Sequence, residues 1–545
     1  MNGKAGTAGL RVPVLVALFT VAPLIEAVRC SSLSSLLGGD VWWHLSSGLW
    51  ILRTHSLPHS GLFTQAASNP WAAVSWLYEM KLAVFYQLFG LRAIPIFAMS
   101  CKMGLAVITF LLAGGWWRNF WPAVGVSAVA QYILGSVAPT PVYASILFFG
   151  IELLLQLEIR RAPGSAGAPA RIPRVAWLLP PLFLVWGNVD VHFVDGLAML
   201  LVFLPAQIRQ RFTSSFESKL AALPSQDIEH SSEDEPSAQP APQGRPSLAQ
   251  RFSAGTDASH PASPGGTAQS ALLPGFALIA VLCFATTLIT PYFVQPYRAF
   301  FASVFNSANA YLPDFKAPGF RQPQDYVLLL LVMSAFLALG LRRSRDLFLI
   351  AILVIASALS FYSQRDVWLA VIVATAVMGE MLNTSYSVSA RDAAQQPSPV
   401  KTLSIAFAAT IVIIVVGAAT LTPRSQSALL AKSAQSYPVE AGNYIRSRHL
   451  PQPIFNAFEW GGFLTHYLPE YPVAIDGRTD LYGDDFVVQY SKAMSAEIRY
   501  TDFTPLANAQ TLLLPRSAIM AGALSTLPGY RMVYTDNVAV VIVKD

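Results

Sequence analysis

The stretch GGDVWWHLSSGLWILR, Gly38–Arg53, follows directly after the first apolar segment of the chain. If Val41–Leu52 forms a helix, Asp40 lies at its N-cap and His44 lies one turn further along the same face. The pair Trp42–Trp43 then lies in the bilayer interface, where tryptophan is enriched. The stretch predicts a carboxylate and an imidazole side by side at a membrane surface, although a helix cap and an aromatic belt would explain the same residues without any chemistry.

The composition around this stretch is that of a membrane protein. The 545 residues are 54% hydrophobic and 12% charged, and the mean hydropathy is +0.46. Such a chain is too apolar to be soluble, so we expect a polytopic membrane protein. The net charge of +5 is small, and its basic residues fall in short loops, which argues against a nucleic-acid partner. The three cysteines have no metal-ligand spacing, so we expect neither a disulfide framework nor a zinc site.

Apolar segments of membrane-spanning character recur along the chain and predict about 11–12 membrane helices. They form an N-terminal membrane module at 1–208, whose first extracytoplasmic loop is 31–72, and a second membrane module at 271–421. The segments lie at 10–28, 73–89, 91–114, 119–137, 139–159, 175–190, 192–208, 271–290, 325–341, 345–362, 366–383 and 401–421.

Basic loops orient these segments. Arg160–Arg161, Arg342–Arg343 and Lys401 are expected on the cytoplasmic side of the membrane. The region that follows the last segment and the loop that carries Asp40 are then both extracytoplasmic.

One segment of the N-terminal half must fail to cross the membrane. Four complete crossings within 73–159 would put Arg160–Arg161 on the wrong side. Either the segment that contains Trp76 lies partly in the interface, or the pair at 119–159 is short and re-entrant. Both alternatives leave eleven true crossings.

Two further regions have a different composition. Residues 209–270 are rich in Ser, Pro, Ala and Gly and predict a disordered cytoplasmic loop, either a plain linker or a regulatory segment. Residues 437–545 alternate strand-like and helical patterns and predict a small three-layer α/β domain with a mainly parallel sheet and a hairpin at Asp536–Asn537. Its expected strands lie at 453–457, 472–476, 511–515, 530–535 and 538–543, and its helices near 438–448, 461–468, 484–494 and 516–526.

Three groups of polar residues are candidates for a site. The first group follows the sixth apolar segment and consists of Asn188, Asp190 and His192. Polar groups at membrane depth are costly unless they line a cavity, so these residues predict a site. Simple interfacial solvation is the alternative explanation. Asp476, Arg478 and Asp480 follow a strand-like run, where α/β sheets bind ligands. A buried Asp–Arg pair that only fixes the loop is the alternative there.

The third group is cationic. Arg365 lies between two apolar segments, and arginine binds phosphate in a bidentate manner. Arg53, Arg298 and Arg321 are further candidates on the expected extracytoplasmic side. The alternative is a surface ion pair or contact with lipid headgroups. The adjacent acids Asp484–Asp485 are a weak metal signal that a helix N-terminus explains equally well, so we expect no metal.

The opening stretch resembles the Gly-Asp-x-Trp-Trp-His-Leu-x-x-Gly signature of bacterial membrane proteins similar to GT-C glycosyltransferases, whose first extracytoplasmic loop carries an essential Asp. The family often has Asn-Leu-His where this chain has Asn188-Val189-Asp190, with His192 displaced by two residues. The resemblance resumes at Pro70-Trp71, Trp76-Leu77-Tyr78-Glu79, Trp186-Gly187-Asn188, Thr290-Pro291-Tyr292 and Asp476-Gly477-Arg478-Thr479-Asp480-Leu481-Tyr482-Gly483.

The resemblance implies a GT-C-like fold and a sugar transfer from a polyprenyl-phosphate donor to an extracytoplasmic glycan, lipid or protein, without a cofactor. It implies Asp40 as the general base with His44 beside it, and Trp43 among the substrate contacts. Two alternatives stay open: a flippase for lipid-linked saccharide, and an assembly protein that retains the fold without activity.

Overall fold

The computed structural model describes residues 10–30, 39–114, 120–137, 140–161, 172–221, 272–383, 399–423 and 425–545. Each of the twelve apolar segments is a helix, because a long apolar run in lipid must satisfy its backbone hydrogen bonds internally. These helices are α2 (Arg11–Cys30), α4 (Trp76–Phe89), α5 (Ala93–Leu112), α6 (Phe120–Ile133), α7 (Val142–Arg161), α8 (Leu179–Trp186), α9 (Phe193–Ala221), α11 (Leu272–Thr287), α13 (Pro323–Leu341), α14 (Leu347–Tyr362), α15 (Val367–Asn383) and α17 (Pro399–Leu421).

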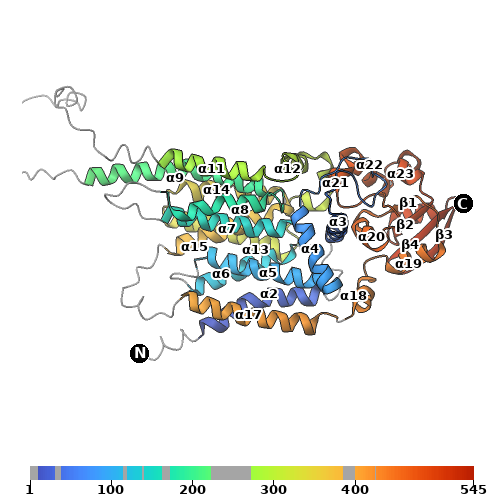
Figure 1. The fold of residues 1–545 in the computed structure, drawn as a ribbon, viewed down its shortest axis with the longest axis horizontal. Helices are drawn as coiled ribbons and strands as arrows, with labels where there is room; N and C mark the ends of the chain where they lie inside the picture. The colour runs from blue at the N-terminus through green and yellow to red at the C-terminus, as the bar shows by residue number, and fades with distance from the viewer. Residues whose placement is uncertain are drawn as a thin grey trace, which may run out of the picture.

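Most of these helices run alongside one another in a bundle, and the C-terminal domain covers one end of it, here named the domain end (Figure 1). Five helical segments within the described residues are long and apolar enough to cross a membrane by length and composition. They are Arg11–Arg29, Trp76–Leu112, Val142–Arg161, Pro323–Leu341 and Val400–Leu421. The expected fold class, a helical membrane bundle with a small C-terminal α/β domain, is confirmed.

Helix α4 is the segment that does not run through the bundle. At its start, Trp76 donates from Nε1 to Oδ1 of Asn188 over 3.0 Å. At its end, Gly90 packs against the side chain of Gln426, which follows the last apolar helix. Asn188 follows α8 and Gln426 begins α18, and Figure 1 shows α4 at the domain end of the bundle. This course of α4 favours the first of the two alternatives for the N-terminal half, and the number of true crossings stays a prediction.

The opposite end of the bundle gathers the charges that orient it. Arg160 at the end of α7 pairs with Asp346, which caps the start of α14 by accepting from two backbone amides. Arg161 pairs with Glu158 and with Glu380 near the end of α15. The basic loops therefore share the end away from the C-terminal domain, as the charge pattern predicts. Which side of a membrane this end faces stays a prediction.

Helix α9 corrects one predicted boundary. It continues to Ala221, so the expected disordered loop at 209–270 begins with helix. The rest of that loop, residues 222–270, lies outside the described residues.

The C-terminal domain has a four-stranded sheet in the order β1-β2-β4-β3. Strands β1 and β2 pair parallel, whereas β4 lies between β2 and β3 and pairs antiparallel with both. The expectation of a mainly parallel sheet was therefore wrong. The predicted hairpin at Asp536 is confirmed: its Oδ1 accepts from the backbone amides of Val538 and Ala539 over 2.7 Å each. The strands are β1 (Ile454–Asn456), β2 (Thr511–Pro515), β3 (Tyr530–Thr535) and β4 (Ala539–Lys544).

Helices cover both faces of this sheet, as expected for three layers. Alternate residues of β2 point to opposite faces. Leu513 belongs to the same buried cluster as Ile445 of α19, and Leu512 belongs to the other cluster, with Leu524 of α24. The expected strand at 472–476 is not formed, because Val473 makes a single bridge with Thr64 of the first loop. The helices are α19 (Val439–Arg448), α20 (Phe458–Tyr467), α22 (Asp484–Met494) and α24 (Ile519–Ser525).

Helix α3 (Asp40–Thr54) joins the bundle to this domain by packing between α4 and α20. Its Trp42 is fully buried, with ring centroids 5.3 Å from Phe463 and 5.4 Å from His466. Trp42 is therefore packed inside the protein, and its expected place in the bilayer interface was wrong, whereas Trp43 is half-buried. Gly39 occupies the N-cap without a side-chain bond, so Asp40 is the first helical residue and not the cap.

Candidate active site

Asp40 lies at the junction between the bundle and the C-terminal domain. Its Oδ1 accepts a hydrogen bond from Nε1 of Trp43 over 3.1 Å, one turn along α3. The backbone of Gly477, from the loop after the Val473 bridge, lies against the carboxylate so closely that a Cβ there would overlap it. The first turn of α3 and a loop more than four hundred residues later thus hold one carboxylate between them.

Charges of both signs act on this carboxylate. Desolvation by the surrounding protein raises the pKa of Asp40, and the negative charges of Asp476 and Asp314 raise it further. The hydrogen bond from Trp43 and the positive charge of Arg365 lower it, but the net shift is upward. A carboxylate with a raised pKa is a stronger base near neutral pH, which suits proton abstraction.

His44 turns away from Asp40 toward Glu79 of α4. Its Nδ1 lies 3.1 Å from Oε1 of Glu79, both side chains are buried, and the ring lies against Trp43 with centroids 3.5 Å apart. Burial and the charge of Arg478 hold the pKa of His44 well below its usual value, so the imidazole is neutral. His44 thus positions Trp43. Glu79 was not among the predicted site residues, although an acid within an apolar helix is a signal for one.

Asp476 and Arg478 form a buried pair. Arg478 donates from Nε to Oδ1 of Asp476 over 2.9 Å and from Nη2 to Oδ2 over 2.5 Å. Its Nη2 also donates to the carbonyl of Leu62, and the guanidinium carbon lies 4.9 Å from the ring centre of Trp71 and 5.8 Å from that of Trp43. With Arg478 only 2% exposed, the pair joins the first loop to the C-terminal domain. This arrangement is the loop-fixing alternative considered for these residues.

Asp480 differs from its two neighbours. It lies on the short helix α21 (Thr479–Tyr482) and is exposed. It is therefore the member of this predicted group that solvent reaches, and its role in substrate binding stays a prediction.

The loop after α8 uses its polar groups in two ways. Asn188 accepts from Trp76 and donates from Nδ2 to the carbonyls of Leu184 and Ile289 over 2.9 Å each. Asn188 also lines an apolar groove of about 440 Å³ between the start of α4, the end of α8 and the segment after α11. The amide holds three elements together beside a space that suits a hydrocarbon chain.

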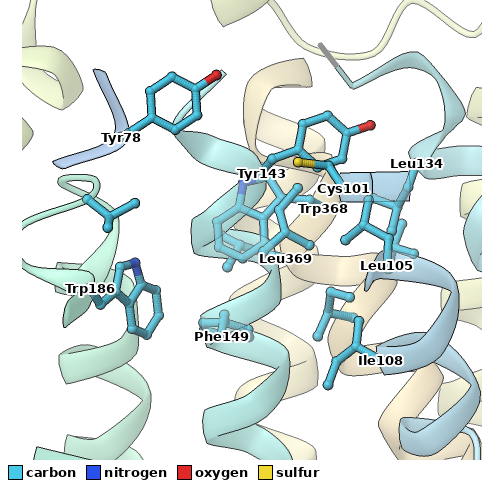
Figure 2. Close-up of a cluster of buried hydrophobic side chains, with 14 of the residues drawn as sticks. Tyr78, Cys101, Leu105, Ile108, Leu134, Tyr143, Phe149, Trp186, Trp368 and Leu369 are labelled. Atoms are coloured by element: carbon cyan, nitrogen blue, oxygen red, sulfur yellow. The ribbon is translucent and has the colours of Figure 1, made fainter. Parts of the chain in front are cut away.

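Asp190 connects this loop to the core of the bundle. Its Oδ2 accepts from Oγ of Ser145 over 2.5 Å, and Ser145 accepts from Nε1 of Trp186 over 2.7 Å. Figure 2 shows Trp186 from α8 beside the core formed by Phe149 of α7 and Trp368 of α15. Phe149 and Trp368 pack edge to face with centroids 5.3 Å apart. The polar loop is therefore anchored to a buried aromatic core.

His192 links the loop to Arg365. Its Nδ1 lies 2.8 Å from Oδ2 of Asp195, and its Nε2 lies 2.8 Å from Nη2 of Arg365. Because a guanidinium only donates, Nε2 accepts and the proton of the neutral ring is on Nδ1, where it donates to Asp195. The guanidinium also lies 5.0 Å from the ring centre of Phe315. Arg365 lies on the 3₁₀ turn η7 (Gln364–Asp366) and is half-buried, and these contacts fix the orientation of its side chain.

The other candidate cations are not held in this way. Arg298 on α12 (Gln295–Phe305) and Arg321 are exposed. Arg53 is exposed in the last turn of α3, about 20 Å along the helix axis from Asp40 for thirteen residues of helix. Of these four arginines, Arg365 is the one whose positive charge lowers the pKa of Asp40.

Asp314 completes the group and was missed from the sequence. It lies on the 3₁₀ turn η6 (Pro313–Phe315), which also carries the ring beneath Arg365. No motif marks it, since an acid in an irregular loop is ordinary. Within the described residues, no cluster of three or more His, Cys, Asp or Glu side chains could hold a metal ion.

Comparison with known proteins returns solved structures only. No protein-family model and no curated protein sequence matches the chain. An oligosaccharyltransferase from Archaeoglobus fulgidus, tethered to an acceptor peptide, is similar over 93% of this chain and 69% of that chain, with 10% identity and a TM-score of 0.48. ArnT from Cupriavidus metallidurans, in the apo state, is similar over 99% of this chain and 98% of that one, with 15% identity and a TM-score of 0.44. The same ArnT bound to undecaprenyl phosphate gives a TM-score of 0.42 at 15% identity. At TM-scores below 0.5, these likenesses assign no activity to this chain.

Proposed function

We propose that this protein is a glycosyltransferase of a bacterial inner membrane, which transfers a sugar from a polyprenyl-phosphate donor to an extracytoplasmic acceptor. One observation carries the proposal. The carboxylate of Asp40 is held between Trp43 and Gly477, and the guanidinium of Arg365 is held by His192, at the same end of the bundle. Burial raises the pKa of Asp40, and the charge of Arg365 lowers it. A base and a phosphate-binding cation are the two groups that such a transfer needs.

The reaction follows from these two groups. The acceptor hydroxyl attacks the anomeric carbon of the donor, and its proton passes to the carboxylate of Asp40. The bond between the anomeric carbon and the phosphate oxygen breaks, and its electron pair leaves with the polyprenyl phosphate. Arg365 stabilises the charge that develops on this phosphate. The negative charge of Asp40 itself favours the positive character that develops at the anomeric carbon.

The surroundings fit an amphipathic donor. The loop that holds His192 against Arg365 also carries Asn188 into the apolar groove of about 440 Å³. A polyprenyl chain in this groove would keep its phosphate near the loop, since the groove is lined mainly by apolar side chains such as Leu77 and Leu184.

The test is sugar transfer by Asp40→Asn. Membranes that contain the full chain are incubated with radiolabelled polyprenyl-phosphate sugars, and label in the acceptor fraction is counted. The amide keeps the size of the side chain and still accepts from Trp43, so the protein level should hold while transfer falls by ~10²–10⁴-fold. Asp485→Asn, at an exposed acid of the C-terminal domain, is the matched control and should transfer normally. Undiminished transfer by Asp40→Asn, at equal protein level, would favour the flippase or the assembly protein.

A further inference from the structure

A second cavity, of about 680 Å³, lies at the far end of α4 from Trp76. Its walls come from the last turn of α4, from the turn η1 (Gly90–Arg92) and from the start of α18 (Gln426–Ser433). These elements meet where α17 ends and the chain enters the C-terminal domain; Figure 1 shows α18 beside this end of α17. The cavity is separate from the Asn188 groove, with which it shares no lining residue.

Its polar groups favour an anion. Arg92 donates from Nη2 to the carbonyl of Ala418 and to Oγ1 of Thr422, and has no carboxylate partner in the described part of the chain. Its Nε is buried and has no hydrogen-bond partner among the described residues. The amides of Gln87 and Gln426 also line the cavity, and none of its lining residues is acidic. Arg92 is half-buried, and a buried donor atom without a partner is costly unless an acceptor, such as an anion, binds to it.

Its apolar groups favour a hydrocarbon chain. Leu88 is 69% exposed and Phe89 is 49% exposed, next to Arg92 at the same cavity. Ile96 of the crossing helix α5 continues the apolar wall. A large exposed leucine and phenylalanine beside a cation at the end of membrane helices match a lipid, whose phosphate and acyl chain are adjacent.

We propose that this cavity binds one anionic glycerophospholipid of the surrounding bilayer. Its phosphate accepts hydrogen bonds from Arg92 and from the amides of Gln87 and Gln426, and an acyl chain lies along Leu88 and Phe89. The lipid then bridges the end of α4 to the start of α18. Because α4 also carries Glu79 and Trp76, this lipid stabilises the elements that hold the active site, without taking part in the transfer.

The experiment uses the purified full chain in detergent. Native mass spectrometry measures binding of phosphatidylglycerol, phosphatidylcholine and soluble glycerol phosphate, and thermal melting measures the stabilisation that each gives. Both lipids carry the phosphate, but the choline ammonium of phosphatidylcholine would lie close to the Arg92 guanidinium and be repelled by it. We therefore expect the wild type to bind phosphatidylglycerol at least about tenfold more tightly than phosphatidylcholine. Equal binding of the two lipids overturns the proposal. Competition by glycerol phosphate at equal concentration would show a site for a soluble anion instead.

Variants locate the site. Arg92→Gln should remove the preference for phosphatidylglycerol, but this change also disturbs the bonds to Ala418 and Thr422. Gln426→Glu leaves those bonds intact and places a negative charge where the phosphate would lie, so it should remove the preference in a protein that still folds. Lys81→Gln, at an exposed cation of α4 outside the cavity, is the matched control. A preference that survives Gln426→Glu, or that Lys81→Gln abolishes equally, overturns the assignment.

Discussion

At the scale of single residues, the charges around Asp40 have opposite effects that can be measured. A general base works only when deprotonated, so transfer should fall as the pH drops through the pKa of Asp40. Arg365 lowers this pKa and Asp314 raises it. Arg365→Gln should therefore move the acid limb of kcat/KM to higher pH, and Asp314→Asn should move it to lower pH. The pH profile of sugar transfer measures both, with Asp485→Asn as the control. Shifts in the same direction would show that Asp40 is not the titrating group.

Arg365 allows a second prediction at this scale. Its guanidinium donates to His192 and packs over Phe315, so the orientation of the side chain depends on a planar group with several donors. Arg365→Lys keeps the charge but loses this arrangement, and we expect the KM for the donor to rise by more than tenfold, the value of about one charge-assisted hydrogen bond. Donor titration in membranes measures the change. An unchanged KM would place the phosphate elsewhere, and Arg298→Lys, at an exposed arginine of the same end, should leave it unchanged.

Helix α4 can be tested as an element. Both of its ends lie at the domain end of the bundle, so both should be reached from the same side of the membrane. Cysteines at Ser68 and Gln87, in a cysteine-free background, should both react with an impermeant thiol reagent in intact cells. A cysteine at Ser344, between α13 and α14 at the opposite end, should react only after the membrane is opened. Labelling of Ser68→Cys without Gln87→Cys would mean that α4 crosses the membrane.

The elements also show what the sequence could and could not predict. The length of an apolar run is a local property, so all twelve apolar helices were predicted. Sheet order is not local: nothing in 538–543 shows that this strand inserts between two others. A strand was wrongly predicted at 472–476 because this run is apolar. Its Val473 is buried against the first loop, and a residue buried in this way gives the same sequence pattern as a residue in a buried strand.

The same reasoning applies to the candidate site. Asp40 and Arg365 were predicted because a motif and a charge between apolar segments mark them. The charge of Asp314 acts on Asp40, and Glu79 contacts His44, only because the folded chain brings these distant residues near one another. The role of His44 likewise depends on the direction in which its ring points: toward Asp40 it would be a catalytic partner, and toward Glu79 it is a positioning residue. The spacing of residues along a helix does not determine this direction.

At the scale of the whole molecule, the C-terminal domain forms a wall of the candidate active site. Trp42 of the first loop is buried against α20, Thr64 is paired with Val473, and the Arg478 guanidinium packs on Trp43. The membrane bundle thus supplies Arg365, whereas the carboxylate of Asp40 is held from the domain side by Gly477. If this is so, a change in the domain that touches only the carboxylate should reduce transfer without unfolding the protein.

Gly477→Ala is this change. Its added methyl group would overlap the carboxylate of Asp40, whose side chain can rotate away, so the fold should persist while the base leaves its working position. A displacement of about 1 Å in a reacting group costs roughly 10²-fold in rate, and we expect a loss of this size in kcat with a melting temperature close to that of the wild type. Gly522→Ala is the matched control, because a Cβ at Gly522 in the same domain meets no atom within 4 Å. It should leave both quantities unchanged. Normal transfer by Gly477→Ala would show that the domain does not position Asp40. A marked fall in melting temperature that accompanies the loss of rate would show that the substitution acts through stability alone.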